Sequence, residues 1–283
     1  MIIVNIQKKF SSGNLKPVEL QFQCEIPLHQ TNALFGPSGA GKTTFLKMLT
    51  GLLTPDCGYI SVDGQVWFDS DNKINLPIVS RSIGFLFQES SLFPNMNVRE
   101  NLEFAFQKGM EDMSLLQELI SLAEVDDLLN QKVERLSGGQ KQRVALVRAL
   151  IQKPKFLFLD EPFVSLDQRI RNQLLALVHS FQNQFRMTVI FISHEIPEVV
   201  KLAKKVYMVS KGQILSSGDP IDCFRQNHND LLEAEIIGMN PSKNEVALWY
   251  PNPLIVLKRE PSEPILKING FCLTQIKIKR DGD

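Results

Sequence analysis

The sequence has few cysteines, no surplus of either charge and no long apolar stretch, and each absence excludes a class of protein. Its four cysteines match neither a metal-ligand spacing nor a Cys-x-x-Cys pair, so we expect isolated small apolar residues in a reducing compartment (Cys24, Cys57, Cys223, Cys272). Lys plus Arg and Asp plus Glu number 31 each among 283 residues, whereas nucleic-acid-binding proteins usually carry a basic excess. We therefore expect no nucleic-acid partner.

No apolar run approaches the ~20 residues that a membrane-spanning helix needs. Residues 1–4 are apolar, but Asn5 and Gln7 interrupt them and no small-residue cleavage site follows. This pattern predicts a first strand rather than a secretion signal. Any role at a membrane would therefore require a partner that spans it.

Three short apolar runs predict the central strands of the fold. Continuous runs of this length are typical of strands buried on both faces of a parallel sheet that helices cover. Ligands of such α/β sheets bind beyond the carboxyl ends of the strands, so the residues that follow each run are candidates for a site. The runs cover residues 31–35, 155–159 and 188–192, and they lead into Gly36, Asp160 and Ser193-His194.

Two further changes of pattern divide the chain. From about residue 89 leucine and isoleucine recur at helical spacing, until Pro154 disfavours more helix. After about residue 230, the segments at 254–257 and 275–279 predict short strands in a region of roughly fifty residues, which is small for an independent core. The predicted organisation is an α/β core at 1–88 and 154–230, a helical subdomain at 89–153 and a β-rich accessory region at 231–283.

Residues 36–43 fit the phosphate-loop pattern Gly-x-x-x-x-Gly-Lys-Ser/Thr completely. The glycines let successive backbone N–H groups point at phosphates, and a helix beginning near Lys42 adds its positive dipole end. Lys42 suits the β- and γ-phosphates, and the Thr43 hydroxyl suits Mg²⁺. An incidental glycine-rich turn is disfavoured because a buried-type strand precedes the loop and a helical pattern follows it. The expected nucleotide-contacting residues are Gly36, Pro37, Ser38, Gly39, Ala40, Gly41, Lys42, Thr43 and Thr44.

Asp160 and Glu161 follow the second apolar run. A carboxylate at a strand end can hold the water shell of a metal ion, and a second one beside it can polarise an attacking water. Such a pair alone is commonplace at a turn, but its position downstream of a complete phosphate loop favours the functional interpretation.

A second helix start lies at residues 136–140, Leu-Ser-Gly-Gly-Gln, before the helical pattern of 141–147. A serine hydroxyl and exposed amides at a helix start can bind an anion, although they also form an ordinary helix cap. A single chain has no obvious need for two phosphate cradles. The residues of this segment expected to contact nucleotide are Ser137, Gly138, Gly139 and Gln140.

The order of these motifs resembles that of the nucleotide-binding subunits of ABC transporters, over roughly residues 1–230. The resemblance combines the phosphate loop, Gln88 after an apolar strand, residues 136–140, Asp160-Glu161-Pro162, Ser165-Leu166-Asp167 and His194. It implies an α/β P-loop NTPase (RecA-like) core with a helical insert and a small C-terminal β-rich appendage. It also implies an ATPase with ATP and Mg²⁺ as its nucleotide and metal.

The same resemblance implies a role for each matching residue. Two subunits would face head to tail, so that the segment at Ser137 of one caps the γ-phosphate held by the Lys42 loop of the other. Gln88 would contact Mg²⁺ and the attacking water, with Thr43 and Asp160 completing the metal site. Glu161 would be the general base, His194 would hold the γ-phosphate, Asp167 would carry signals across the seam, and Phe10 is a candidate for the ring that stacks on adenine, or else a plain core residue.

A membrane partner is expected near residues 85–94, a segment that is unusually apolar for a loop near a catalytic site. A helix of a permease could lie there with Leu92 and Phe93 as anchors. Alternatively, these side chains pack the helical insert against the core.

Within the family, the chain most resembles the ATPases of molybdate-type oxyanion importers, in residues 83–89, 92–94 and 98–102. Importers for sulfate, ferric iron and polyamines share much of this pattern, and molybdate-type subunits usually carry a longer accessory β domain. The resemblance implies a peripheral subunit on the cytoplasmic face of the inner membrane. Its expected partners are a permease, a second nucleotide-binding subunit in a homodimer and, indirectly, a periplasmic or extracellular solute-binding protein.

Two other classes of protein remain as alternatives. A soluble ABC ATPase that acts on ribosomes or DNA usually has two nucleotide domains or a long coiled-coil insertion, and the sequence shows neither. A phosphate-loop kinase or GTPase would not use residues 136–140.

Overall fold

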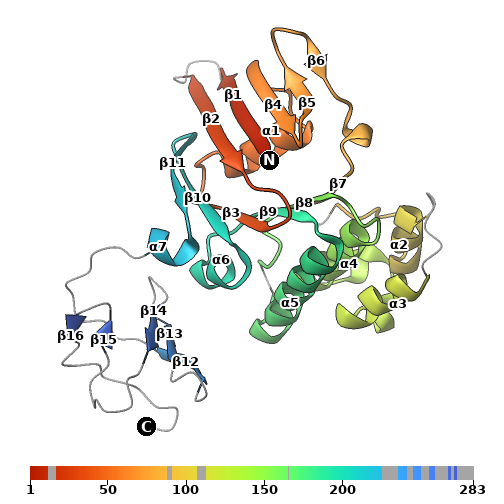
Figure 1. Cartoon of the computed structure of the whole chain (residues 1–283). Coiled ribbons are helices and arrows are strands. Elements are labelled where there is room, and N and C mark those ends of the chain that lie inside the picture. The colour runs from red at the N-terminus through yellow and green to blue at the C-terminus, as the bar shows by residue number, and fades with distance from the viewer. Residues whose placement is uncertain are drawn as a thin grey trace.

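The structure is a computed structural model that describes residues 1–11, 17–87, 91–106, 113–164 and 166–224, and the backbone of five short strands beyond them. Its central sheet has the strand order β11-β10-β3-β9-β8-β7 (Figure 1). All of these strands run parallel except β11, which pairs antiparallel with β10 at one edge. The strands are β3 (Thr31–Phe35), β7 (Ile83–Leu86), β8 (Phe156–Asp160), β9 (Thr188–Ile192), β10 (Lys205–Ser210) and β11 (Gln213–Gly218).

Helices cover both faces of the central sheet, which explains why β8 and β9 are apolar and buried along most or all of their length, whereas the edge strand β11 is mostly exposed. In β8, Leu157 and Leu159 pack into the core on one face, whereas Phe158 packs into the core on the other. The first core contains helices α4 (Gly138–Leu150), α5 (Gln168–Phe185), α6 (Ile196–Leu202) and α7 (Pro220–Phe224), and the second contains α1 (Lys42–Thr50). The predicted parallel sheet between helices is therefore confirmed.

An antiparallel sheet with the order β2-β1-β4-β5-β6 packs against α1. The rings of Phe22 and Phe45 are 4.7 Å apart at this interface. Buried Arg81 joins the two parts, because its guanidinium donates to the carbonyls of Leu49 at the end of α1 and Trp67 in β5. The strands are β1 (Ile2–Phe10), β2 (Val18–Ile26), β4 (Cys57–Val62), β5 (Gln65–Asp69) and β6 (Ile74–Asn75), and the turn η1 (Ile78–Ser80) precedes Arg81.

Helices follow one another between β7 and β8, in the segment where the sequence predicts a helical subdomain. Figure 1 shows α2 and α3 beside α4. Arg169 of α5 makes a two-pronged ion pair with Glu124, at 2.6 and 2.8 Å, and so ties this group of helices to the core. The elements are α2 (Val98–Phe106), α3 (Met113–Leu122), η2 (Asp126–Leu128), η3 (Val133–Arg135) and α4.

Beyond residue 224 the described backbone forms a three-stranded antiparallel sheet and a two-stranded one. The strand predicted at 254–257 corresponds to β14, whereas 275–279 lies outside the described residues. The strands are β12 (Glu235–Asn240), β13 (Glu245–Trp249), β14 (Ile255–Lys258), β15 (Lys267–Ile268) and β16 (Phe271–Cys272).

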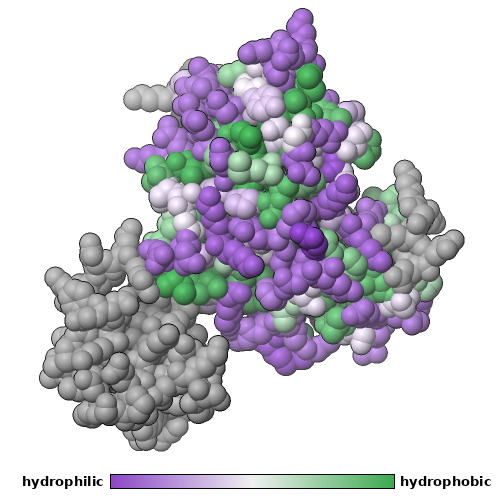
Figure 2. Space-filling model, viewed as in Figure 1, coloured by the Kyte–Doolittle hydropathy of each residue, from purple (hydrophilic) through white to green (hydrophobic). Residues whose placement is uncertain are grey.

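The surface and the thiols of the structure match most of what the sequence leads us to expect. Within the described ranges, no helix combines the length and the apolar character that crossing a bilayer requires. On the face shown in Figure 2, hydrophobic residues form separate areas among hydrophilic ones. The cysteines whose side chains are described are free thiols. The expectation that all of them are packed as small apolar residues is wrong for Cys57, because this residue begins β4 at the surface and contacts the Gln7 side chain.

Candidate functional site

The loop between β3 and α1 has the backbone shape that its glycines predict. A Cβ on Gly36 would lie 2.0 Å from the Val209 carbonyl oxygen, so only glycine fits there. Gly39 and Gly41 adopt left-handed conformations with φ of 74° and 97°. Side chains other than glycine rarely adopt these angles, so the turn depends on both residues.

The remaining loop residues divide between an exposed rim and a buried base. Pro37 and Ser38 are exposed, whereas Ala40 is buried in the core that contains α1. The Ala40 N–H donates to the Pro37 carbonyl at 3.2 Å, and the Ala40 carbonyl accepts from Gly212 at 3.0 Å. Thr44 is half-buried in the first turn of α1.

The Lys42 ammonium is hydrogen-bonded to the backbone of its own loop. It donates to the Gly36 carbonyl at 2.7 Å and to the Pro37 carbonyl at 2.8 Å. Burial lowers the pKa of Lys42, and the charges of Glu161 and Asp160 oppose that shift. The loop therefore holds a desolvated cation, which a phosphate group would stabilise.

Thr43 and Asp160 meet where α1 faces the carboxyl end of β8. The Thr43 hydroxyl donates to the Asp160 carboxylate at 3.0 Å. Asp160 is 2% exposed; burial raises its pKa, and the Thr43 hydrogen bond opposes the rise. A hydroxyl beside a carboxylate is a set of hard oxygen donors, which is the type that Mg²⁺ prefers.

Glu161 and His194 come together from neighbouring strands. Asp160 pairs with Ile192 in the parallel register of β8 and β9, and the Glu161 N–H donates to the Ile192 carbonyl at 3.2 Å. A Glu161 carboxylate oxygen lies 3.8 Å from Nδ1 of His194, whose other ring nitrogen is 3.5 Å from Glu195. Glu161 adopts φ of 49°, a left-handed conformation that costs energy in a non-glycine residue and is typical of functional sites.

A cavity of about 170 Å³ lies beside this pair. Its lining includes both Glu161 and His194, together with Arg171, Ser193 and Glu198. The sequence predicted the first two as strand-end residues, whereas Arg171 and Glu198 were missed. Their helical context is that of ordinary surface charges, and only the packing of α5 against α6 brings them to the cavity.

Residues 137–140 form a complete capping box at the start of α4. The Ser137 hydroxyl accepts the Gln140 N–H at 3.3 Å, and the Gln140 side chain accepts the Ser137 N–H at 2.8 Å. A Cβ on Gly138 would meet nothing within 4 Å, so the space beside the cap is open, and Gly139 follows as the second helical residue. No hydrogen bond or ion pair joins residues 137–140 to residues 36–44, all of which the structure describes.

The other candidate residues lie at defined places in the fold. Asp167 caps α5, since its carboxylate accepts the Ile170 N–H at 3.0 Å. Phe10 ends β1 and is 40% exposed, so it is not a plain core residue. Gln88 and Ser165 lie outside the described residues.

In the apolar segment before α2, one residue fits the packing of the helical insert against the core and another fits contact with a permease, the two interpretations that the sequence left open. Leu92 is buried in the core, as the packing alternative predicts. Phe93 is 39% exposed and packs edge-on against Phe104, with rings 4.8 Å apart, while the Arg148 guanidinium lies 5.3 Å from its centre. Phe93 is therefore available at the surface.

Comparison with known proteins decides the family. The ABC transporter family matches residues 20–164, which is half of the chain. The chain belongs to the ABC transporter family. The resemblance inferred from the sequence and the P-loop NTPase fold are thereby confirmed.

Curated relatives of this ABC protein include molybdenum import ATP-binding proteins. The protein of this name, ModC, from Mesorhizobium japonicum is 40% identical over 205 residues, which cover 72% of this chain and 55% of the relative. The one from Vibrio parahaemolyticus is 36% identical over 215 residues, covering 76% of this chain and 57% of the relative. The chain thus spans just over half the length of the curated relatives it matches.

Solved structures with the same fold include dimeric cassettes. The dimeric structure of MJ0796, a bacterial ABC transporter cassette, matches with a TM-score of 0.69 at 26% identity, covering 78% of this chain and 99% of that one. The dimeric post-hydrolysis state of the same cassette, bound to ADP and Pi, matches with a TM-score of 0.68 at equal identity and coverage.

Proposed function

We propose that the chain binds and hydrolyses ATP in a head-to-tail pair of nucleotide-binding subunits and thereby drives an importer for molybdate or a related oxyanion. The observation that carries this proposal is the convergence of Lys42, Thr43, Asp160, Glu161 and His194 at the carboxyl ends of three adjacent parallel strands.

The phosphate loop supplies the binding energy for the triphosphate. Backbone N–H groups of the loop and of the first turn of α1, together with the dipole of that helix, favour an anion in the loop. The β- and γ-phosphate oxygens would replace the Gly36 and Pro37 carbonyls as acceptors for Lys42. Phe10, exposed at the end of β1, would stack on the adenine.

Thr43 and Asp160 would hold Mg²⁺, with Gln88 as a further ligand. Their hydrogen bond is what supports this assignment, because a hydroxyl and a carboxylate already in contact form part of an oxygen-donor set. When bound, the ion neutralises charge on the phosphate oxygens. Glu161 accepts the proton of the attacking water, and His194 donates a hydrogen bond to the γ-phosphate.

The second phosphate cradle acts on the neighbouring subunit. Residues 137–140 have no bonded link to the Lys42 loop within the chain, and the space beside Gly138 is open. A second copy placed head to tail would bring its Ser137 segment to the γ-phosphate, while Asp167 lies at the seam. The dimeric cassette of MJ0796 supports such pairing at the level of the fold.

Ser137→Arg is expected to prevent pairing while leaving ATP binding by the single chain intact. The larger cationic side chain would fill the open space beside Gly138. Pairing is measured as the ATP-dependent increase in molecular mass in a Glu161→Gln background, where hydrolysis does not consume the complex. ATP-driven dimers of the Ser137→Arg protein would contradict the role of the cradle in trans.

Two variants serve as controls for this experiment. Ser121→Arg adds the same side chain at an exposed serine of α3 and should pair normally. Ser137→Ala removes the cap of α4 without adding bulk, at a cost of about 1 kcal/mol, and shows in thermal unfolding how much of the effect is loss of the cap.

The relatives, rather than the catalytic geometry, support the proposed import role. Proteins named for molybdenum import match at 36–41% identity, and the exposed Phe93 and Phe104 offer an apolar contact for a permease helix. The subunit would thus sit on the cytoplasmic face of the inner membrane, and a solute-binding protein would deliver cargo to the permease from the other side. Sulfate, ferric iron and polyamines are the alternative cargoes.

The identity of the cargo is tested by measuring solute uptake in a strain of the source organism from which the gene for this protein has been deleted. Uptake of radiolabelled molybdate is expected to fall to background and to recover with the wild-type chain but not with Glu161→Gln. Loss of sulfate, iron or polyamine uptake with unchanged molybdate uptake would reassign the cargo and leave the ATPase proposal standing.

A further inference from the structure

The turn that carries His194 is held by the side chain that precedes it. The Ser193 hydroxyl donates to a carboxylate oxygen of Glu198 at 2.6 Å and accepts the Glu195 N–H at 2.9 Å. Both bonds fix residues 193–195 against the first turn of α6. The position of the His194 ring therefore depends on Glu198, which itself does not contact the imidazole.

Glu198 is an unusual residue to find at this place. It is 5% exposed and lies where α5 packs on α6, and burial raises its pKa while the Ser193 hydrogen bond and the Arg171 charge oppose the rise. A buried ion pair is weak evidence for stability, since desolvation offsets most of the attraction. The geometry that the pair imposes is the better explanation for a carboxylate here.

Arg171 connects Glu198 to the segment before α5. Its Nε lies 3.5 Å from the second Glu198 oxygen and is buried without a hydrogen-bond acceptor among the described residues. Its Nη2 donates to the Leu166 carbonyl at 3.2 Å, and its backbone N–H donates to the Asp167 carbonyl at 2.9 Å. A chain of contacts thus runs from His194 through Ser193, Glu198 and Arg171 to residues 166–167, along the cavity that Glu161 also lines.

We propose that Glu198 is a positioning residue, which with Arg171 sets the orientation of His194 and links it to residues 166–167. This inference rests on the proposed function, because it concerns the step in which His194 contacts the γ-phosphate. An N–H···O hydrogen bond is about 2.9 Å long, so the 3.5 Å ion pair has room to shorten. Movement of residues 166–167 when two subunits pair would shorten the Arg171–Glu198 ion pair. His194 would then be oriented for its contact with the γ-phosphate.

The test is a double-mutant cycle on the ATPase activity of the full chain. Glu198→Gln keeps the volume and an acceptor for Ser193 but removes the charge that faces Arg171. It is expected to lower kcat about 10- to 100-fold, as misplacement of a reacting group does, with KM for ATP changed less than about two-fold. In a His194→Ala background the same substitution is expected to change kcat by less than about two-fold, because the residue through which it acts is gone.

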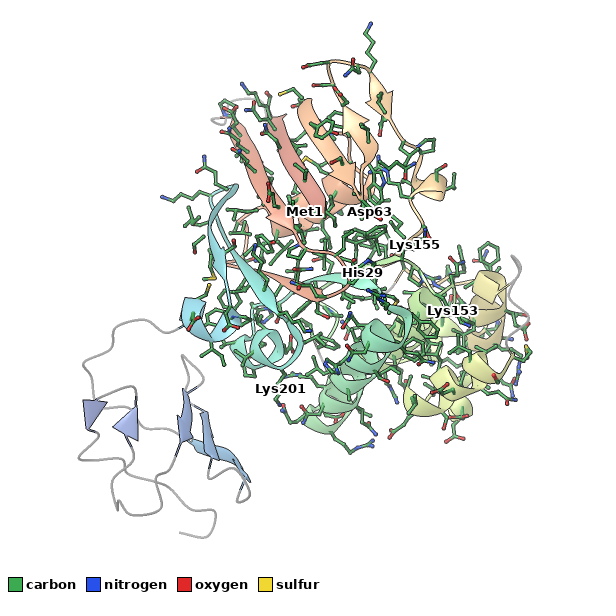
Figure 3. The ribbon with its side chains drawn as sticks, in the orientation of Figure 1. Met1, His29, Asp63, Lys153, Lys155 and Lys201 are labelled. Atoms are coloured by element: carbon green, nitrogen blue, oxygen red, sulfur yellow. The ribbon has the colours of Figure 1, made fainter. Side chains whose placement is uncertain are left out.

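Further variants separate positioning from general damage to the fold. Ser193→Ala removes one hydroxyl from the chain of contacts and is expected to show the same lack of additivity with His194→Ala. Lys201→Ala, at the residue labelled on α6 in Figure 3, removes the exposed Lys201–Asn172 contact between α6 and α5 and should leave kcat unchanged.

The outcomes are distinguishable. Wild-type kcat in Glu198→Gln, or an equal loss in both backgrounds, would overturn the positioning role. A wild-type chain that hydrolyses no ATP, alone or with its permease, would instead contradict the proposed function itself.

Discussion

Glu161→Gln is expected to lower kcat for ATP hydrolysis by at least about 100-fold while nucleotide binding stays intact. A general base contributes roughly 10² to 10⁴-fold, and the amide cannot accept the proton of the attacking water. The substitution keeps the size of the side chain and its place 3.8 Å from His194. Because the chemical step is blocked after binding, the ATP-bound pair of subunits should accumulate.

The measurement combines ATP turnover with molecular mass in the presence of ATP. Glu118→Gln, the same change at an exposed residue of α3, should hydrolyse ATP at the wild-type rate and form no lasting dimer. Near-normal turnover by Glu161→Gln would show that another group is the base. Loss of ATP affinity would place Glu161 in binding instead of chemistry.

The sequence predicts best the residues whose role depends on neighbours in the chain. The apolar run of β3, the loop glycines and the start of α1 at Lys42 all lie where local pattern places them. Strand-end positions of Asp160 and His194 follow for the same reason. The distance of 3.8 Å between Glu161 and His194 could not be predicted from the local pattern. It requires β8 and β9 to be adjacent and in register, which is a property of the whole sheet.

Buried charged residues that belong to no recognisable motif are the ones that sequence patterns miss. Arg81 has the local context of a surface cation, yet it is 2% exposed and its donors face the carbonyls of Leu49, Trp67 and Leu76. A Cβ on Gly51, the left-handed C-cap of α1, would also lie 2.6 Å from its guanidinium carbon, so a residue thirty positions away adds to the local requirement for glycine. Arg171 and Glu198 were missed for the same reason, since only tertiary packing supplies their partners.

Lys42→Ala is expected to weaken ATP binding by at least about 10-fold and to abolish measurable hydrolysis. A hydrogen bond between charged groups contributes about 1.5–3 kcal/mol, and every 1.4 kcal/mol corresponds to ten-fold in affinity. The variant also leaves the Gly36 and Pro37 carbonyls without their donor. Binding is measured by titration with ATP. Lys201→Ala is the control, since it removes an exposed lysine of α6 that is not part of the phosphate loop. Wild-type affinity and turnover in Lys42→Ala would contradict the phosphate-loop assignment.

The pH dependence of ATP affinity gives the same prediction a second readout. Burial lowers the pKa of Lys42 in the free chain, and a bound phosphate restores the preference for the charged form. Binding therefore takes up a proton wherever Lys42 is partly neutral, so affinity should fall as pH rises through the pKa of the free chain. Above about pH 8 a terminal phosphate with a pKa of about 6 is already ionised. In that range we expect the decrease in ATP affinity to come from deprotonation of Lys42. It should be missing in Lys42→Ala and present in Lys201→Ala, and an equal fall in both variants would assign the titration to another group.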